Sequence, residues 1–170
     1  NNIGVLYGEL GSTEKALKYY RESINYYRNS EDLAISYKNI GGSLWELGNR
    51  DEAVTYYMKA LDLKRKIGNP SAIGTSLIDL ARVENQRENY ARALDYAKQA
   101  HWIADSLKDY SLLSSSNRWL GFIYEQQGEK TKAFARYKKS LAYSRFLSKD
   151  SQIGPLMAMA SVYDSNQSDS

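Results

Sequence analysis

The sequence has no cysteine, and this absence excludes disulfides, thiolate metal sites and cysteine nucleophiles together. Its one histidine, His101, is not part of an H-E-x-x-H metal motif. Neither a G-x-x-x-x-G-K-S/T phosphate loop nor a dinucleotide-binding fingerprint occurs. No apolar run reaches the ~18 residues that a membrane span requires. We therefore expect no catalytic residue, no cofactor and no metal in this segment, so that any enzyme activity would lie outside it.

Proline and net charge are also scarce. Two prolines and eleven glycines in 170 residues argue against a loop-rich or disordered chain, and an apolar fraction of 42% suits one globular domain. The 23 basic and 20 acidic residues leave a net charge of +3, too small to indicate a nucleic acid or an anionic membrane as a direct partner. Two basic clusters, LKRK at 63–66 and RYKK at 136–139, are interpreted as solvated helix faces in preference to a nucleic-acid patch.

An internal repeat decides the architecture. The segment LGSTEKALKYYRESI at 10–24 aligns without gaps with LGNRDEAVTYYMKAL at 47–61, a spacing of 37 residues. RENYARALDYAKQAH at 87–101 and QGEKTKAFARYKKSL at 127–141 continue the series at a spacing of 40. A second recurring piece precedes each of them, so the unit is a pair of helices. The repeats span about 1–29, 30–68, 69–108 and 109–148, with a partial repeat at 149–170.

Turn residues separate the predicted helices at matching places. Glycine adopts a left-handed backbone at little cost, and it stands where a helix is expected to stop at Gly11, Gly48 and Gly128. The predicted N-caps are Ser12, Asn49 and Asn89, and Glu52 has the capping-box spacing from Asn49. The predicted helices are 3–10, 13–28, 31–47, 50–67, 70–87, 90–107, 110–127, 130–147 and 151–165.

Small residues recur in both helices of each unit. Those early in the second helix are Ala16, Ala53, Ala93 and Ala133, and those opposite them in the first helix are Gly4, Gly41, Ala81 and Gly121. Because neither site carries a bulky side chain, the two backbones can approach closely. Tyr20, Tyr57 and Tyr137, one turn later, would fill the space beside them.

The combination L/I-G-x-x-Y/L, then Gly, then A-x-x-x-Y-x-x-A/S resembles the tetratricopeptide repeat, and it covers nearly the whole chain. The resemblance implies an all-α fold, a right-handed superhelix (α-solenoid) built from antiparallel helix pairs. The spacings of 37 and 40 exceed the usual 34 residues of the family and resemble its long-repeat subtype.

The two ends of the sequence suggest a fragment of a longer protein. It opens with only the later half of a first helix, and its last helix is apolar without a following partner, through Leu156, Met157, Met159, Val162 and Tyr163. A capping helix is the alternative, but terminal caps usually carry a polar outer face. The sequence shows no signal peptide. Because the chain is expected to begin inside a repeat, this absence does not indicate a compartment, and the localisation is left undecided.

The third repeat departs from the pattern. Glu84 stands where the other repeats have an apolar or aromatic residue, Glu88 replaces the turn glycine, and Ala97 replaces the tyrosine. Either this repeat is loosely packed and Glu84 reaches water, or Glu84 forms a buried polar contact with a hydroxyl or a cation. We favour the first interpretation because a lone buried carboxylate is costly.

His101 shares an apolar column with Ile24, Leu61 and Leu141. No nucleophile or carboxylate pattern accompanies it, so we interpret it as a packed histidine in preference to a catalytic base.

In the resembled family, partners most often bind the concave wall formed by the first helices. The resemblance places inward-facing positions three before, and one, four and five after, the small Gly or Ala site. Carried onto this sequence, they are Lys38, Trp45, Glu46, Ile78, Arg82, Asn85, Gln86, Arg118, Phe122, Glu125 and Gln126, with Met157 and Asp164 as weaker candidates. Aromatic anchors beside amides and charges of both signs suit an extended peptide or a partner helix.

The leading hypothesis is a non-enzymatic protein-interaction scaffold that binds a peptide or partner helix on its concave surface, as a regulatory part of a larger bacterial signalling protein. The alternative is a sensory receptor domain that binds a short signalling peptide or a small molecule. In the receptor hypothesis the ligand would close the superhelix and change its pitch, and the flanking sequence would separate the two hypotheses.

Overall fold

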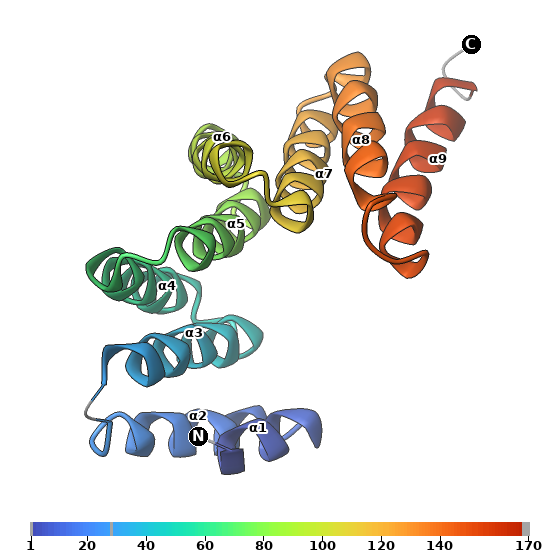
Figure 1. Ribbon diagram of the computed structural model, residues 1–170. Helices are drawn as coiled ribbons and strands as arrows, with labels where there is room; N and C mark the ends of the chain where they lie inside the picture. Colours follow the sequence, from blue (N-terminus) through green and yellow to red (C-terminus); the bar gives the residue numbers. More distant parts are fainter. Residues whose placement is uncertain (1, 28, 168–170) are drawn as a thin grey trace. The chain divides into compact units, whose positions relative to one another are not determined.

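The computed structural model describes residues 2–27 and 29–167, and this part of the chain is all α-helical (Figure 1). The helices are α1 (Asn2–Glu9), α2 (Thr13–Ser23), α3 (Ser30–Glu46), α4 (Arg50–Ile67), α5 (Pro70–Gln86), α6 (Tyr90–Leu107), α7 (Tyr110–Gln126), α8 (Lys130–Ser144) and α9 (Ile153–Gln167), with a short 3₁₀ helix, η1 (Asp150–Gln152), before α9. The chain divides into two compact units, Asn1–Ser76 and Leu77–Ser170, and α5 crosses the boundary. Consecutive helices joined by short turns pack against each other, as α3 does on α4 and α7 on α8. The predicted all-α class of helix pairs is confirmed.

Two helices end earlier than predicted. α2 stops at Ser23 rather than at residue 28, and α8 stops at Ser144 rather than at residue 147. In each, the final serine turns its hydroxyl back onto the backbone: Ser23 donates to the carbonyl of Tyr20 at 2.8 Å, and Ser144 donates to that of Leu141 at 2.9 Å. Such bonds compete with a continued helix. Residue 28 itself lies outside the described residues, and the other predicted ends fall within two residues of those observed.

The glycines that were predicted to end helices adopt the left-handed backbone. The φ angles are 70° at Gly11, 83° at Gly48 and 75° at Gly128. Glu88 holds the same conformation, with a φ of 63°, at the corresponding turn of the third repeat. A left-handed backbone costs a residue with a Cβ roughly 1–2 kcal/mol, so the contacts around this turn must impose it.

The predicted N-cap residues stand at the N-cap positions, but their side chains do not cap the helices. Ser12, Asn49 and Asn89 each precede a helix, but none makes a side-chain cap bond. Their ψ angles lie near 60°, whereas a capping oxygen reaches the first turn from a more extended backbone. The capping box fails as well, because Glu52 instead pairs with Arg21 at 2.8 Å.

Side-chain capping occurs instead at α3, α5 and α7. Asn29 accepts a hydrogen bond from the backbone N–H of Asp32, Asn69 accepts from that of Ala72, and Asp109 accepts from that of Leu112. Asn29 and Asp109 have extended backbones, with ψ of 149° and 97°. The side-chain caps therefore fix the starts of α3, α5 and α7, the first helices of their repeats.

The close approach of paired helices at small residues is confirmed. A Cβ added to Gly121 would lie 2.6 Å from the ring of Tyr137 and 3.2 Å from the carbonyl oxygen of Ala133. An added Cβ would lie 2.5 Å from the ring of Tyr20 at Gly4 and 3.1 Å from that of Tyr57 at Gly41. The tyrosine ring thus occupies the space that glycine leaves on the facing helix.

The third repeat is tightly packed, contrary to expectation. Ala81, Ala93 and Ala97 are fully buried in one cluster with Leu120 and Ile123 of α7. With alanine in place of tyrosine, the helices still meet without a gap that would expose the core.

Glu84 is buried, so the prediction that it reaches water is wrong. Its side chain is 1% exposed, and its Oε2 accepts a 2.7 Å hydrogen bond from Asn89 Nδ2. The guanidinium groups of Arg87 and Arg92 lie 3.7 and 3.8 Å from its carboxylate oxygens. The burial cost that argued against a buried carboxylate is offset by these partners, two of which follow Glu84 on the turn into α6.

The Gly121 contact predicts a loss of stability on adding one methyl group. We expect Gly121→Ala to lower the free energy of unfolding by about 1–2 kcal/mol, because overpacking against Tyr137 outweighs the better helix propensity of alanine. Gly42→Ala is the matched control, since its added Cβ meets only the hydroxyl of Tyr57 at an ordinary 3.6 Å. That variant should gain about 0.5–1 kcal/mol. Thermal unfolding followed by circular dichroism measures both, and equal effects would contradict the packing argument.

The buried carboxylate predicts a second loss. Glu84→Leu conserves size but removes the partner of Asn89 and of the half-buried Arg87, so we expect about 1–3 kcal/mol of destabilisation. Glu22→Leu, at an exposed helical glutamate, is the control and should change stability by less than about 0.5 kcal/mol. A Glu84→Leu variant as stable as the parent would show that this network contributes nothing to folding.

Candidate functional site

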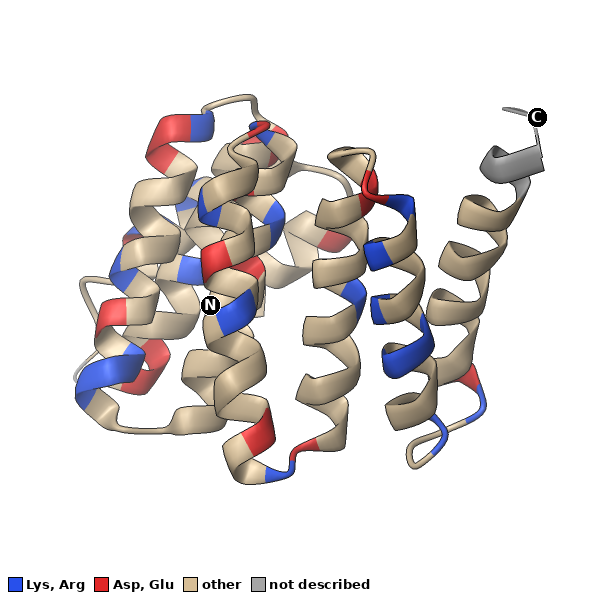
Figure 2. Ribbon diagram, turned by 90° about the horizontal axis from the view of Figure 1, so that it is seen from above, with Lys and Arg blue, Asp and Glu red and all other residues tan. Residues whose placement is uncertain are grey.

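Two adjoining pockets, which share Arg118 and Gly154, form a groove along α7 and α9 in the second unit. Both helices pack on α8 and also touch each other, and Figures 1 and 2 show the three side by side. α8 carries basic residues at 130, 132, 136, 138 and 139 and no acidic one, whereas α7 has only Arg118 and Glu125 as charged residues (Figure 2). Of the residues that line this groove, Arg118 and Asp150 are the charged ones.

One end of the groove is a polar pocket of about 300 Å³. Its lining consists of Ser111, Ser114, Ser115, Arg118, Leu147, Asp150, Ser151, Gly154 and Pro155. Ser114 is buried, and its hydroxyl lies 3.1 Å from both the carbonyl oxygen and the hydroxyl of Ser140 on α8. These bonds hold α7 against α8, and Ser111 and Ser115 add two further serines to the α7 side of the pocket.

The adjoining end is a mostly apolar pocket of about 170 Å³. Its lining consists of Arg118, Trp119, Phe122, Tyr137, Gly154 and Ala158. Trp119 and Phe122 meet edge to face, with ring centroids 5.5 Å apart, and Phe122 is 38% exposed. Gly154 and Ala158 leave room on the α9 side because their side chains are absent or small.

Tyr137 contributes a buried ring to this pocket from α8. Its hydroxyl donates a 2.5 Å hydrogen bond to Glu125 Oε2. Burial raises the pKa of Tyr137, and the bond to Glu125 raises it further, so the hydroxyl stays protonated as a donor. The other carboxylate oxygen of Glu125 accepts from Ser161 at 3.3 Å. Glu125 thereby links α7 to both α8 and α9.

Arg118 lines both pockets and marks the boundary between them. Its side chain is exposed, and among the described residues it forms no hydrogen bond or ion pair. Both oxygens of Glu125, the other charged residue of α7, are occupied by Tyr137 and Ser161. An open guanidinium, with its planar fork of donors, is suited to a carboxylate or phosphate group.

Four of the predicted binding residues lie on α7, and the structure brings two of them into the groove. Arg118 and Phe122 line it, Glu125 is half-buried and holds Tyr137, and Gln126 is exposed at the end of the helix. The resemblance missed the groove residues Ser111, Ser114, Ser115, Trp119, Gly154 and Ala158. The i, i+3, i+4 and i+7 spacing of Ser111, Ser114, Ser115 and Arg118 would have indicated that these four share one helix face.

The predicted residues on α5 have mixed surroundings. Ile78 is half-buried beside the core cluster of Ala104, Leu112 and Leu113, so it packs in the interior of the second unit. Arg82 is half-buried, Gln86 is exposed, and Asn85 is buried with an Oδ1 atom that has no hydrogen-bond partner among the described residues. Their part in binding stays a prediction.

The predicted residues on α3 belong to the first unit. Trp45 lies under the guanidinium of Arg50, 4.2 Å from the ring centroid, and Glu46 accepts a 2.9 Å hydrogen bond from Thr13. Lys38 is half-buried. Of the two weaker candidates, Met157 is exposed on α9, and the side chain of Asp164 lies outside the described residues. Their role in binding also remains a prediction.

Two family models, both described as tetratricopeptide repeat, match residues 1–30 and 32–106, which together are well over half of the chain. The chain belongs to the tetratricopeptide repeat family. Its helix pairs, turn glycines and facing small residues are those the family resemblance implied, and its fold is that of a protein-interaction scaffold. No curated protein matches the chain.

Solved structures share this tetratricopeptide repeat fold at low identity. BtubC from P. vanneervenii is 20% identical with a TM-score of 0.81, and the match covers 96% of this chain and 70% of that one. A signal transduction ATPase with a tetratricopeptide repeat sensor, from Pyrococcus horikoshii, is 21% identical with a TM-score of 0.84, over 95% of this chain and 26% of that one. A Rap protein complexed with Competence and Sporulation Factor is 14% identical with a TM-score of 0.82, over 98% and 48%.

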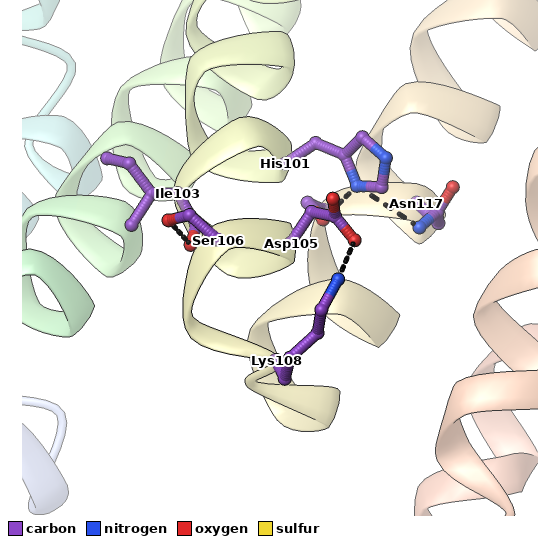
Figure 3. A network of polar contacts seen from close by, with 7 residues as sticks. His101, Ile103, Asp105, Ser106, Lys108 and Asn117 are labelled. Carbon is purple, nitrogen blue, oxygen red and sulfur yellow. Dashed lines mark hydrogen bonds and ion pairs between the residues drawn. The ribbon is translucent and has the colours of Figure 1, made fainter.

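His101 lies in a polar contact between repeats rather than in a reactive site. Its Nδ1 is 3.3 Å from the hydroxyl of Ser116 and 3.4 Å from Nδ2 of Asn117, both buried on α7, and Figure 3 shows the ring pointing at Asn117. An amide nitrogen can only donate, so Nδ1 accepts and the ring is neutral. Arg136 of α8 donates to Asn117 Oδ1 at 3.4 Å and completes the contact. This agrees with the interpretation of His101 as a packed histidine.

Within the described residues, no group of three histidine, cysteine, aspartate or glutamate side chains is placed to hold a metal ion. None of the described helices is long and apolar enough to cross a membrane. The groove along α7 and α9 joins a polar pocket to a mostly apolar one.

His101 predicts a pH dependence of stability. Burial lowers its pKa, and the positive charges of Arg136 and, more weakly, Lys139 lower it further, against an opposing effect of Asp105. The folded chain then binds the proton less tightly than the unfolded chain, whose histidine pKa is about 6.5. The stabilising contribution is complete above pH ~6.5 and is lost as the pH falls through the lowered folded value.

We therefore expect the melting temperature of the parent to fall more between pH 7.5 and 5.5 than that of His101→Gln, which cannot titrate. The difference between the two melting curves, measured at each pH in the same buffer series, isolates the histidine from the carboxylates. Parallel curves would show that protonating His101 does not disturb the contact.

Proposed function

We propose that this chain binds an extended peptide segment of a partner protein in the groove between α7 and α9. The observation that supports the proposal most is the junction of a polar and an apolar pocket at Arg118, on an open face of the second unit. Such a mixture of hydroxyls, one cation and an aromatic pocket suits a peptide better than a flat protein surface.

The dimensions of the groove agree with a short peptide. From Ser111 to Phe122, α7 rises ~17 Å at 1.5 Å per residue. An extended strand covers the same distance in about five residues at ~3.3 Å each. The serine hydroxyls can bond the backbone amides and carbonyls of that strand, and Phe122 and Trp119 can enclose one of its side chains. A peptide of this length would span both pockets.

We further propose that the chain serves as a regulatory interaction module of a signalling protein. Two of the similar structures support this context: a tetratricopeptide repeat sensor of a signal transduction ATPase, and a Rap protein complexed with Competence and Sporulation Factor. In the first of these, the matching part is 26% of a longer chain, which is the arrangement expected of a sensor attached to other domains.

Selection of peptides on the chain tests the binding proposal. A phage-displayed random octapeptide library should yield ligands, and hydrogen–deuterium exchange with a selected peptide should protect α7 and α9. Phe122→Ala should weaken binding at least about tenfold, as loss of a central aromatic anchor does. Phe134→Ala is the matched control, because Phe134 is also 38% exposed but lies on α8 outside the groove lining, and it should stay within about twofold. Protection elsewhere, or equal effects of the two variants, would contradict the proposal.

A further inference from the structure

The charges around the groove are few and unevenly placed. The apolar pocket has Arg118 as its one charged lining residue, and the polar pocket has Arg118 and Asp150. Arg118 has no ion-pair partner among the described residues. A peptide side chain that enters next to Phe122 therefore meets a cation that forms no ion pair among the described residues.

A carboxylate is the group that fits this cation best. The guanidinium offers parallel N–H donors that match the two oxygens of a carboxylate, and desolvation by a bound peptide would strengthen the contact. Asp150 shares the polar pocket, so the pocket is close to neutral overall and disfavours a guest with a second negative charge. A single carboxylate is better accommodated than a doubly charged phosphate or a run of acidic residues.

The spacing of the two subsites follows from helix geometry. Arg118 and Phe122 are four residues apart on α7, which is ~6 Å along the axis and one turn on the same face. Side chains at i and i+2 of an extended peptide lie on one face ~7 Å apart. The carboxylate and the apolar side chain that fill the two subsites are thus expected two residues apart.

We infer that the groove recognises a carboxylate at Arg118 together with an apolar side chain in the Trp119–Phe122–Ala158 pocket, in an extended peptide. The inference rests on the proposed function and names the chemistry of its partner. Arg118 selects the charge, Phe122 and Trp119 hold the apolar residue, and Gly154 keeps the passage between the two subsites open, because its backbone carries no side chain beside Arg118 Cδ.

Peptides selected on the parent chain test this inference. Among them we expect enrichment of Asp or Glu two positions from Leu, Ile, Met, Phe or Trp. One selected octapeptide is then synthesised with blocked ends in two forms, one with the acidic residue and one with its amide. A third form has the amide and a free C-terminus, so that a side-chain carboxylate is distinguished from that of a chain end. Fluorescence anisotropy gives the dissociation constants.

Arg118→Gln should weaken the acidic peptide about tenfold or more and leave its amide form unchanged, because only the charged pair is lost. Arg118→Glu should bind a peptide with lysine in place of the acidic residue more tightly than it binds the acidic peptide. Lys138→Gln, at an exposed cation of α8, is the control and should have no effect beyond general salt screening. Unchanged melting temperatures show that the exposed Arg118 can be replaced without loss of fold.

Different results would contradict carboxylate recognition and peptide binding. If Phe122→Ala weakens a selected peptide but Arg118→Gln binds it within twofold of the parent, carboxylate recognition is wrong and peptide binding stands. If no peptide is enriched on the parent, the proposed function itself fails. Binding that needs the free C-terminus in place of the acidic side chain supports carboxylate recognition and assigns it to a chain end.

Discussion

The contact of Gly121 with Tyr137 is the constraint on which the second unit depends. Because Gly121 has no side chain and Ala133 has a small one, α7 and α8 approach until the tyrosine ring lies against the glycine backbone. That position aims the hydroxyl at Glu125, which also accepts from Ser161 of α9. One close helix contact thus sets the ring in the apolar pocket and, through Glu125, ties α9 to α7.

The third repeat meets the same requirement by other means. Ala97 replaces the tyrosine and is fully buried, so the helices there pack through alanine alone. A polar contact takes the place of the ring: Glu84 is covered by Arg87 and Asn89 on the turn into α6 and by Arg92 in the first turn of α6. The left-handed Glu88 lies in that turn, and the contacts on either side of it hold a backbone that glycine would adopt freely. A repeat can therefore lose its aromatic residue without becoming loose.

The sequence allowed the helix pairs, their register and the small-residue contacts to be predicted, because these depend on periodicity and on residue size. It did not give the side-chain capping bonds, since these depend on the ψ angle of the residue before the helix, and that angle is set by the preceding turn. Glu84 was misjudged because its partners lie three to eight residues away, on the turn after α5 and at the start of α6, and the pattern did not give the geometry of that turn. Arg118 and Phe122 were predicted from the family positions, whereas the role of Glu125 depends on a tyrosine from another helix.

The position of Arg118 also shows how one repeat can be specialised without disturbing the stack. Its equivalents three residues before the small site are Lys38 and Ile78, and Ile78 packs in the interior while Arg118 is open. The small sites themselves stay Gly or Ala because a larger side chain would push the paired helix away. Neighbouring positions on the same helix that do not press against the paired helix carry no such restriction, so charge and aromatic character can change there at little cost to folding. Surface chemistry can therefore differ from repeat to repeat, and the binding site that we propose for the second unit lies where small residues of α9 leave the aromatic face of α7 uncovered.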